Sequence, residues 1–448
     1  MTSADVEFDI RREFAAIALT DAEPPPDRPG GGGTGLASLS EELFQFHIVP
    51  FCASLASLSA LAATSRQLRR RCYARLTCPA PTLDLCIDLY CPLCPMRKQH
   101  GTSRGAVSLI ASFPLRRLKM HCFVSDVPAC LSALAAKRTV ESLELRLTNK
   151  SLSCSLDRIL PRGLGPDDFP ALRELVLDSS HLQHVNVAGR VRLLSMLGAH
   201  LEVLVLSGTS SAGLLHHLSA LCPRLRRLRV DRVRSEGEIA GYKSESLAEL
   251  DVRRVSFVLP PLRLPMLRRL RYSSSSRLEP VQMEAMVASL PRVRDLVLEV
   301  CSRDADLTVA AICRHLPGLR SLTLEGSYEA GALSAQALQL LGRSCPIADL
   351  CVRSAQSVTP LALGEGAFLQ LAKLPELTCA VVPYSDDIFT DLFAVLSSSP
   401  RLRRLIFWER RKWLGTPKWL EIEHTLAVYA ASFPAIEVRL RDVQQLGS

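Results

Sequence analysis

The sequence predicts an α/β solenoid, a stack of short repeats that each supply one strand and one helix, preceded by a short all-α module. A template of the form L-x-x-L-x-L recurs between Leu115 and Leu402, with a mean spacing of about 26 residues, which suits a repeat of roughly 20–29 residues. Apolar runs at helical spacing lie between the copies, for example Leu333, Ala337, Leu338, Leu340 and Leu341.

The template predicts a strand because its last two apolar residues, two positions apart, point to one face while the residue between them points to the other. A proline before many copies, such as Pro223 or Pro317, ends the preceding helix. One strand and one helix cannot bury a core alone, so the repeats stack, with parallel strands on the concave side and helices on the convex side. Clear copies begin at Leu172, Leu201, Leu225, Leu247, Leu267, Val293, Leu319, Ile347 and Leu402, and weaker ones at Leu115, Val140 and Leu377.

Cysteines accompany several copies of the template. Cys222-Pro223 and Cys345-Pro346 directly precede two of them, and Cys301 follows a third at the turn. With these residues the chain from about residue 115 onward resembles leucine-rich-repeat proteins of the cysteine-containing kind. The resemblance implies a solenoid that binds another protein on its concave face.

The segment 36–76 predicts two or three short helices. Ser40 is a suitable N-cap, and Glu41 and Glu42 after it favour the positive end of a helix dipole. The segment resembles an F-box, whose pattern is matched by Leu39-Ser40-Glu41-Glu42-Leu43-Phe44 and then by Leu58, Leu61, Thr64, Ser65, Arg66 and Leu68. The F-box family binds the Skp adaptor of cullin–RING ubiquitin ligases. The resemblance implies adaptor contacts by Leu39, Glu42, Leu43, Phe44, Ile48, Leu58, Leu61, Ser65 and Leu68.

Three regions are expected: a disordered segment with a Pro/Gly linker at 1–35, the F-box-like module at 36–78, and the repeats at 79–448. The linker is indicated by the run DAEPPPDRPGGGGTGL, since proline extends a chain and glycine loosens it. The acidic start lacks the pattern of a signal peptide, and no apolar stretch is long enough to span a membrane. We therefore expect a cytoplasmic or nuclear protein with reduced cysteines.

The residues beside the strand leucines are the expected target-binding positions on the concave face. Their arginines suit an acidic or phosphorylated segment, because a guanidinium forms paired, charge-assisted hydrogen bonds with such groups. The alternative is a solvated face on which neighbouring acids neutralise the arginines. The candidates are Arg227, Arg229, Asp251, Arg253, Arg269, Arg271, Arg404 and Trp408.

No motif predicts catalysis, and no cofactor or metal is expected. Ser103 in GTSRG has the letters of a nucleophile elbow but no buried strand before it. Cys86, Cys91, Cys94 and His100 could hold zinc, although structural thiols are the favoured interpretation.

The sequence thus predicts a substrate receptor of a cullin–RING ligase, with the adaptor, a cullin and an unidentified protein target as partners. The alternative is a repeat scaffold in which the N-terminal helices are only a cap. The net charge of +9 is small for 448 residues, so neither nucleic acid nor a membrane is an expected partner.

Overall fold

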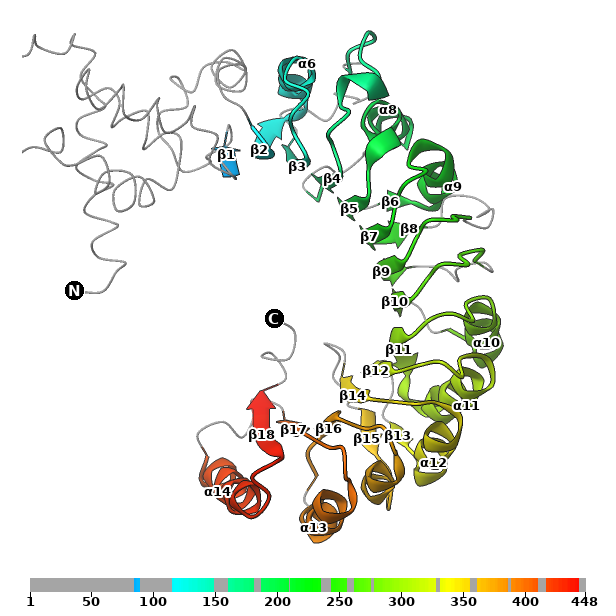
Figure 1. Cartoon of the computed structure of the whole chain (residues 1–448), viewed down its shortest axis with the longest axis vertical. Coiled ribbons are helices and arrows are strands. Elements are labelled where there is room, and N and C mark those ends of the chain that lie inside the picture. The colour runs from blue at the N-terminus through cyan, green and yellow to red at the C-terminus, as the bar shows by residue number, and fades with distance from the viewer. Residues whose placement is uncertain are drawn as a thin grey trace, which may run out of the picture. The chain divides into compact units, whose positions relative to one another are not determined.

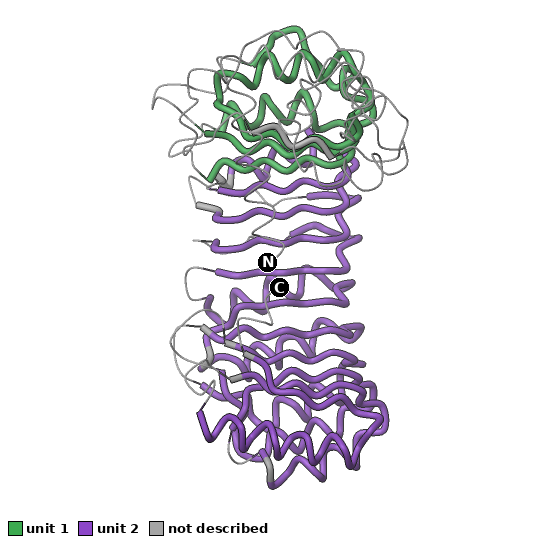
Figure 2. Tube along the Cα trace, turned by 90° about the vertical axis from the view of Figure 1, so that its left-hand side faces the viewer, with its two compact units in different colours: residues 1–201 green, residues 202–448 purple. Residues whose placement is uncertain are grey.

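The computed structural model describes residues 84–88, 115–148, 160–180, 187–208, 210–234, 243–255, 262–274, 278–327, 331–354, 361–385, 388–409 and 416–442. The chain divides into two compact units, residues 1–201 and 202–448 (Figure 2). The predicted α/β class, with a parallel sheet and helices in a solenoid-like stack, is confirmed. The segments predicted at 1–35 and 36–78 lie outside the described residues.

In the described residues of the first unit, four parallel strands follow one another in chain order, with helical segments after β2, β3 and β4. The weak template copies at Leu115 and Val140 form real strands, because every second residue, such as Leu118 and Leu143, is buried. The strands are β1 (Asp84–Asp88), β2 (Arg117–Phe123), β3 (Ser142–Thr148) and β4 (Glu174–Asp178), and the helical segments are η4 (Val124–Asp126), α6 (Val127–Ala135), η5 (Pro166–Asp168), α8 (Val187–Leu197) and η6 (Gly198–His200).

The second unit carries one long parallel sheet, again with its strands in chain order. Its register places equivalent template leucines side by side, as where Leu228 pairs with Leu250 and Leu250 with Leu270. The last strand, β18, comes from a copy that the template did not predict. The strands are β5 (Val203–Ser207), β7 (Arg227–Asp231), β9 (Glu249–Val255), β10 (Arg269–Ser274), β11 (Asp295–Cys301), β12 (Ser321–Ser327), β14 (Asp349–Ser354), β16 (Cys379–Pro383), β17 (Arg404–Glu409) and β18 (Glu437–Asp442).

The described helices of the second unit lie along the outer side of its sheet, and none of them lies on the inner side (Figure 1). The core lies between the two layers, where leucines of the strands meet apolar helix residues such as Leu338 and Leu341. None of the described helices is long and apolar enough to cross a membrane. The helices are α9 (Ala212–Leu221), α10 (Pro280–Ala288), η7 (Ser302–Asp304), α11 (Ala305–His315), α12 (Ala335–Ser344), η8 (Phe368–Lys373), α13 (Ile388–Ser398) and α14 (Pro417–Ser432).

Two further pairs of short parallel strands lie outside the long sheet of the second unit. β6 (Ser210–Ser211) pairs with β8 (Val233–Arg234), and β13 (Gly331–Leu333) pairs with β15 (Leu361–Leu363). In each pair, one strand of the long sheet lies between the two short strands in sequence: β7 lies between β6 and β8, and β14 between β13 and β15. Each pair therefore adds backbone hydrogen bonds between neighbouring repeats to those of the long sheet.

Candidate functional site

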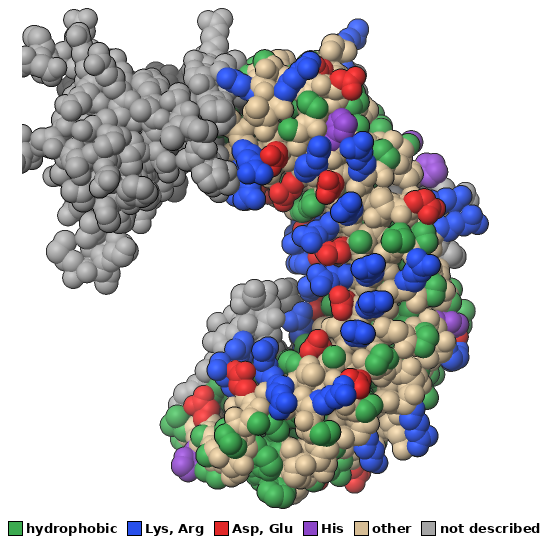
Figure 3. All heavy atoms as spheres, viewed as in Figure 1, with side chains coloured by type: hydrophobic (Ala, Val, Ile, Leu, Met, Phe, Trp, Pro, Cys, Tyr) green, Lys and Arg blue, Asp and Glu red, His purple; other side chains and the backbone are tan. Residues whose placement is uncertain are grey.

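The inner side of the sheet in the second unit, here called the sheet face, is the candidate site. Alternate residues of each strand point to it, and the in-register pairing aligns them in rows that cross the strands. The first row contains Arg227, Glu249, Arg269 and Asp295, and the second contains Arg229, Asp251 and Arg271. Basic and acidic side chains therefore alternate across the strands (Figure 3).

Ion pairs run along the first row. Arg227 Nε lies 2.7 Å from Glu249 Oε2. Arg269 lies between two acids, with Nη1 3.7 Å from Glu249 and Nη2 3.3 Å from Asp295. Because the arginines are more than half exposed and their acidic partners about one third, each pair contributes only about 0–1 kcal/mol to stability. Their main effect is to neutralise one another's charge.

A second group of charges lies on β7 and β9, and its arginines are less exposed than those of the first row. Arg253 Nη2 donates to Asp251 Oδ2 at 2.7 Å, while Arg229 Nε lies 3.5 Å from Asp231 and 4.0 Å from Asp251. The hydrogen bond from Arg253 to Asp251 raises the pKa of Arg253 despite partial burial. This group is also a mutually neutralised set.

Glu325 on β12 is the buried centre of the sheet face, with a relative exposure of 8%. Its Oε1 accepts hydrogen bonds from Arg353 Nη2 at 2.5 Å and from Arg271 Nη2 at 3.2 Å. Burial alone would lower the pKa of Arg353, but the charge of Glu325 and its hydrogen bond raise that pKa overall. One carboxylate thus links arginines on β10 and β14.

The structure brings the predicted arginines and Asp251 together on this face. Arg404 lies farther along, on β17, where its Nε is 3.3 Å from Glu437. Trp408 occupies a sheet-face register position but is only 3% exposed, and its Nε1 donates to the backbone oxygen of Val352 at 2.5 Å. Its indole therefore packs within the unit and presents little surface to a partner.

Arg353 is a sheet-face residue that the sequence analysis did not include among its candidates. It follows the template copy that begins at Ile347, so the alternation of that strand carried the necessary signal. What the sequence did not show is that Arg353 and Arg271 share Glu325, because β10 and β12 are separated by another strand.

Most of the described thiols behave as core residues, whereas Cys351 and Cys379 are partly exposed. Cys222, Cys301 and Cys345 are buried, and burial raises the pKa of Cys222 to about 12. Within the described ranges, no group of three His, Cys, Asp or Glu side chains could hold a metal ion. The side chain of Cys86 lies outside the described residues, as do Cys91, Cys94 and His100, for which zinc binding was the less favoured alternative. Ser103 and all predicted adaptor contacts also lie outside them.

Together these features define an α/β, solenoid-like protein whose helices cover one side of a parallel sheet and whose other side is a charged, ion-paired face. No family profile matches the chain, and no curated protein matches it.

Proposed function

We propose that the chain is a non-catalytic leucine-rich-repeat protein that holds a protein target on the sheet face. The observation that supports this most directly is the ordered register of charges of both signs across neighbouring strands. Since backbone ladders and ion pairs hold these side chains before a partner arrives, little ordering free energy remains to be lost on binding. Such a pattern selects a partner with complementary charges.

We further propose that the target is held for ubiquitin transfer. The F-box resemblance of residues 36–78 supports binding of the Skp adaptor, and through it of a cullin. In this role the chain supplies proximity between target and ligase and no chemistry of its own. The alternative proposal, a scaffold without a ubiquitin role, keeps the sheet face and treats the N-terminal helices as a cap.

The adaptor is the first partner to test. We expect the purified chain to bind the Skp adaptor in a pull-down, and Leu58→Asp with Leu61→Asp to abolish binding, because a buried charge in an apolar interface is costly. Leu420→Asp is a matched control, since Leu420 is 61% exposed on α14. Its binding should be unchanged. Failure of the unaltered chain to bind at micromolar concentrations would favour the scaffold.

The ubiquitin role can then be tested in cells. Proteins whose ubiquitylation depends on the chain should lose it with Leu58→Asp and Leu61→Asp. They should also lose it with Arg229→Glu and Arg271→Glu, which reverse two charges of the sheet face. If only the Leu58→Asp and Leu61→Asp variant lost ubiquitylation, the adaptor role would be supported. The proposal that the target binds the sheet face would then be wrong.

A further inference from the structure

A second set of arginines lies at the edge of the sheet, outside the sheet face. Arg226, Arg268, Arg294 and Arg320, here called the edge arginines, each stand immediately before a strand: β7, β10, β11 and β12, respectively. All four side chains are exposed. The strand between the first two, β9, is preceded by Ala248, so no acidic residue interrupts the set at this position.

The backbone holds the edge arginines at regular intervals. The carbonyl oxygen of Arg268 accepts from the N–H groups of Arg294 and Asp295 at 2.8 and 3.0 Å. That of Arg294 accepts from Arg320 and Ser321 at 2.8 and 2.9 Å. Successive edge arginines on β10, β11 and β12 are therefore spaced at the strand separation of about 4.8 Å. Three guanidinium groups on neighbouring strands can reach one ligand.

The edge arginines differ from those of the sheet face in having no acidic partner. In the part of the chain that the structure describes, none of the four forms an ion pair or a side-chain hydrogen bond. Asp295, which directly follows Arg294 in sequence, is engaged by Arg269 on the sheet face. Glu202, which directly precedes β5, is the backbone neighbour of Arg226, because its carbonyl oxygen accepts from Arg226 N at 2.9 Å. The three consecutive edge positions Arg268, Arg294 and Arg320 include no acidic residue, so the positive charge of the edge is concentrated there.

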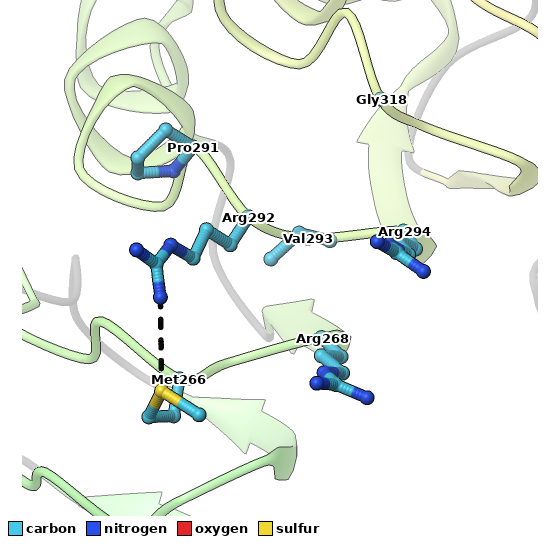
Figure 4. A pocket seen from close by; sticks show the side chains of 7 residues that line it. All are labelled: Met266, Arg268, Pro291, Arg292, Val293, Arg294 and Gly318. Atoms are coloured by element: carbon cyan, nitrogen blue, oxygen red, sulfur yellow. Dashed lines mark hydrogen bonds between the residues drawn. The ribbon is translucent and has the colours of Figure 1, made fainter.

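A shallow pocket of about 370 Å³ opens between two of the edge arginines. Figure 4 shows Arg268 and Arg294 extending side by side from neighbouring strands, with Arg292 directed toward Met266. Arg292 Nη1 lies 3.7 Å from the Met266 sulfur, a weak acceptor. No carboxylate lines this pocket, whose residues are Met266, Arg268, Pro291, Arg292, Val293, Arg294 and Gly318.

We propose that the edge arginines bind a phosphorylated segment of a partner protein, with one phosphate group in the pocket between Arg268 and Arg294. A guanidinium matches a phosphate through two parallel, charge-assisted hydrogen bonds. The set consists of arginines, and the pocket lining includes no aromatic side chain. Single-stranded nucleic acid, by contrast, is generally held by aromatic residues on which its bases stack. The proposal goes beyond the function proposed above, since the site would serve a ligase receptor and a scaffold alike.

The test uses the full chain and a labelled peptide of alternating phosphoserine and glycine, followed by fluorescence anisotropy at about 0.15 M salt. Arg268→Glu with Arg294→Glu should weaken binding at least roughly tenfold, because hydrogen bonds to charged groups are among the stronger ones. The matched control is Arg343→Glu with Arg403→Glu, which makes the same change in net charge. Arg403 precedes β17 at the equivalent template position but is flanked by Thr378 and Ile436. The control should bind within about threefold of the unaltered chain, since long-range charge effects are screened.

Four further probes decide the identity of the ligand: a serine peptide, a glutamate peptide, a single-stranded RNA and vesicles. The serine version of the peptide should not bind, and the glutamate version should bind more weakly than the phosphoserine version. If the Arg268→Glu and Arg294→Glu variant bound the phosphoserine peptide as tightly as the unaltered chain does, the proposed site would be wrong. An unchanged circular dichroism spectrum would show that this variant is folded. A glutamate peptide that binds as tightly would overturn the preference for phosphate. Tighter binding of a short single-stranded RNA, or of vesicles containing phosphatidylserine, would overturn the assignment to a protein segment.

Discussion

At the scale of single residues, the sheet face and the sheet edge use the same side chain in two different ways. Arg271 and Arg353 are partly buried and share Glu325, whereas Arg268 and Arg294 are exposed and lack an acidic partner in the described residues. The difference follows from what stands opposite on neighbouring strands. The ion-paired arginines hold the side chains of the sheet face in place. The edge arginines, which lack an acidic partner in the described residues, leave their positive charge available for a ligand.

Substitution of Glu325 tests how far the sheet face depends on its buried carboxylate. We expect Glu325→Gln to lower the free energy of unfolding by about 2 kcal/mol, because two partly buried arginines lose their shared counter-charge. The side chains of Arg353 and Arg271 are 18% and 32% exposed, so water offsets part of the loss. Urea unfolding followed by circular dichroism measures the change.

The control for that substitution is Glu249→Gln in the exposed first row. The side chains of its partners, Arg227 and Arg269, are each 57% exposed, so the expected loss is below about 1 kcal/mol. Equal losses in the two variants would show that burial at Glu325 has no energetic consequence.

At the scale of elements, each repeat is shaped by how its strand begins and ends. Two strands of the second unit end in an unusual way, because Arg232 and Arg254 adopt positive φ angles of 60° and 53°. Arginine rarely adopts this left-handed conformation. Arg232 N donates to the carbonyl oxygen of Arg253 at 2.8 Å, which helps to hold the turn at the end of β7.

The contact between α12 and η8 allows a sharp test of packing between neighbouring repeats. A methyl group at Gly342 would lie 2.8 Å from Leu374 Cδ2 and 3.2 Å from the backbone oxygen of Lys373. Alanine favours a helix over glycine by about 1 kcal/mol, but Leu374 is buried and overpacking costs about 1–3 kcal/mol. We expect Gly342→Ala to destabilise the protein by about 1 kcal/mol, measured by urea unfolding.

Gly318→Ala is the matched control. Nothing lies within 4 Å of its added methyl group, and Gly318 does not require a positive φ. This variant should be neutral or slightly more stable, because alanine restricts the unfolded chain. A stabilising Gly342→Ala would mean that η8 moves freely away from α12.

At the scale of the whole molecule, each central strand of the second unit has a neighbour on both sides. In such stacks the free energy of unfolding is approximately a sum of the stability of each repeat and of the interfaces between neighbouring repeats. A destabilising substitution should therefore affect its own repeat and the adjacent repeats most. Leu324 on β12 is fully buried with strands on both sides, while Val438 on β18 is 9% exposed in the last strand.

We therefore expect Leu324→Ala to reduce amide protection in β11, β12 and β14 together, with a loss of about 3 kcal/mol. Val438→Ala should affect only β17 and β18, with a loss of about 1 kcal/mol. Hydrogen exchange read by mass spectrometry resolves these strands. A uniform loss of protection along the unit in both variants would contradict nearest-neighbour behaviour.

Much of the fold could be predicted from the sequence because two periods are local properties of the chain. Alternation with a period of two in copies such as the one at Leu225 predicts a strand, and spacing near 3.6 predicts a helix. Even the weak copy at Val140 forms β3. β18 was missed because its leading residues, Ile436 and Val438, are not part of a full template.

The sequence by itself thus determined the α/β class, the positions of most strands and which residues of each strand face away from the core. Only the tertiary structure decided which charges meet. Register between strands placed Glu325 within reach of Arg271 and Arg353, covered Trp408, and left Arg268 and Arg294 without an acidic partner in the described residues. The physical reason is that alternation depends on neighbours along one chain segment, whereas pairing, burial and exposed charge depend on neighbours brought together from separate repeats.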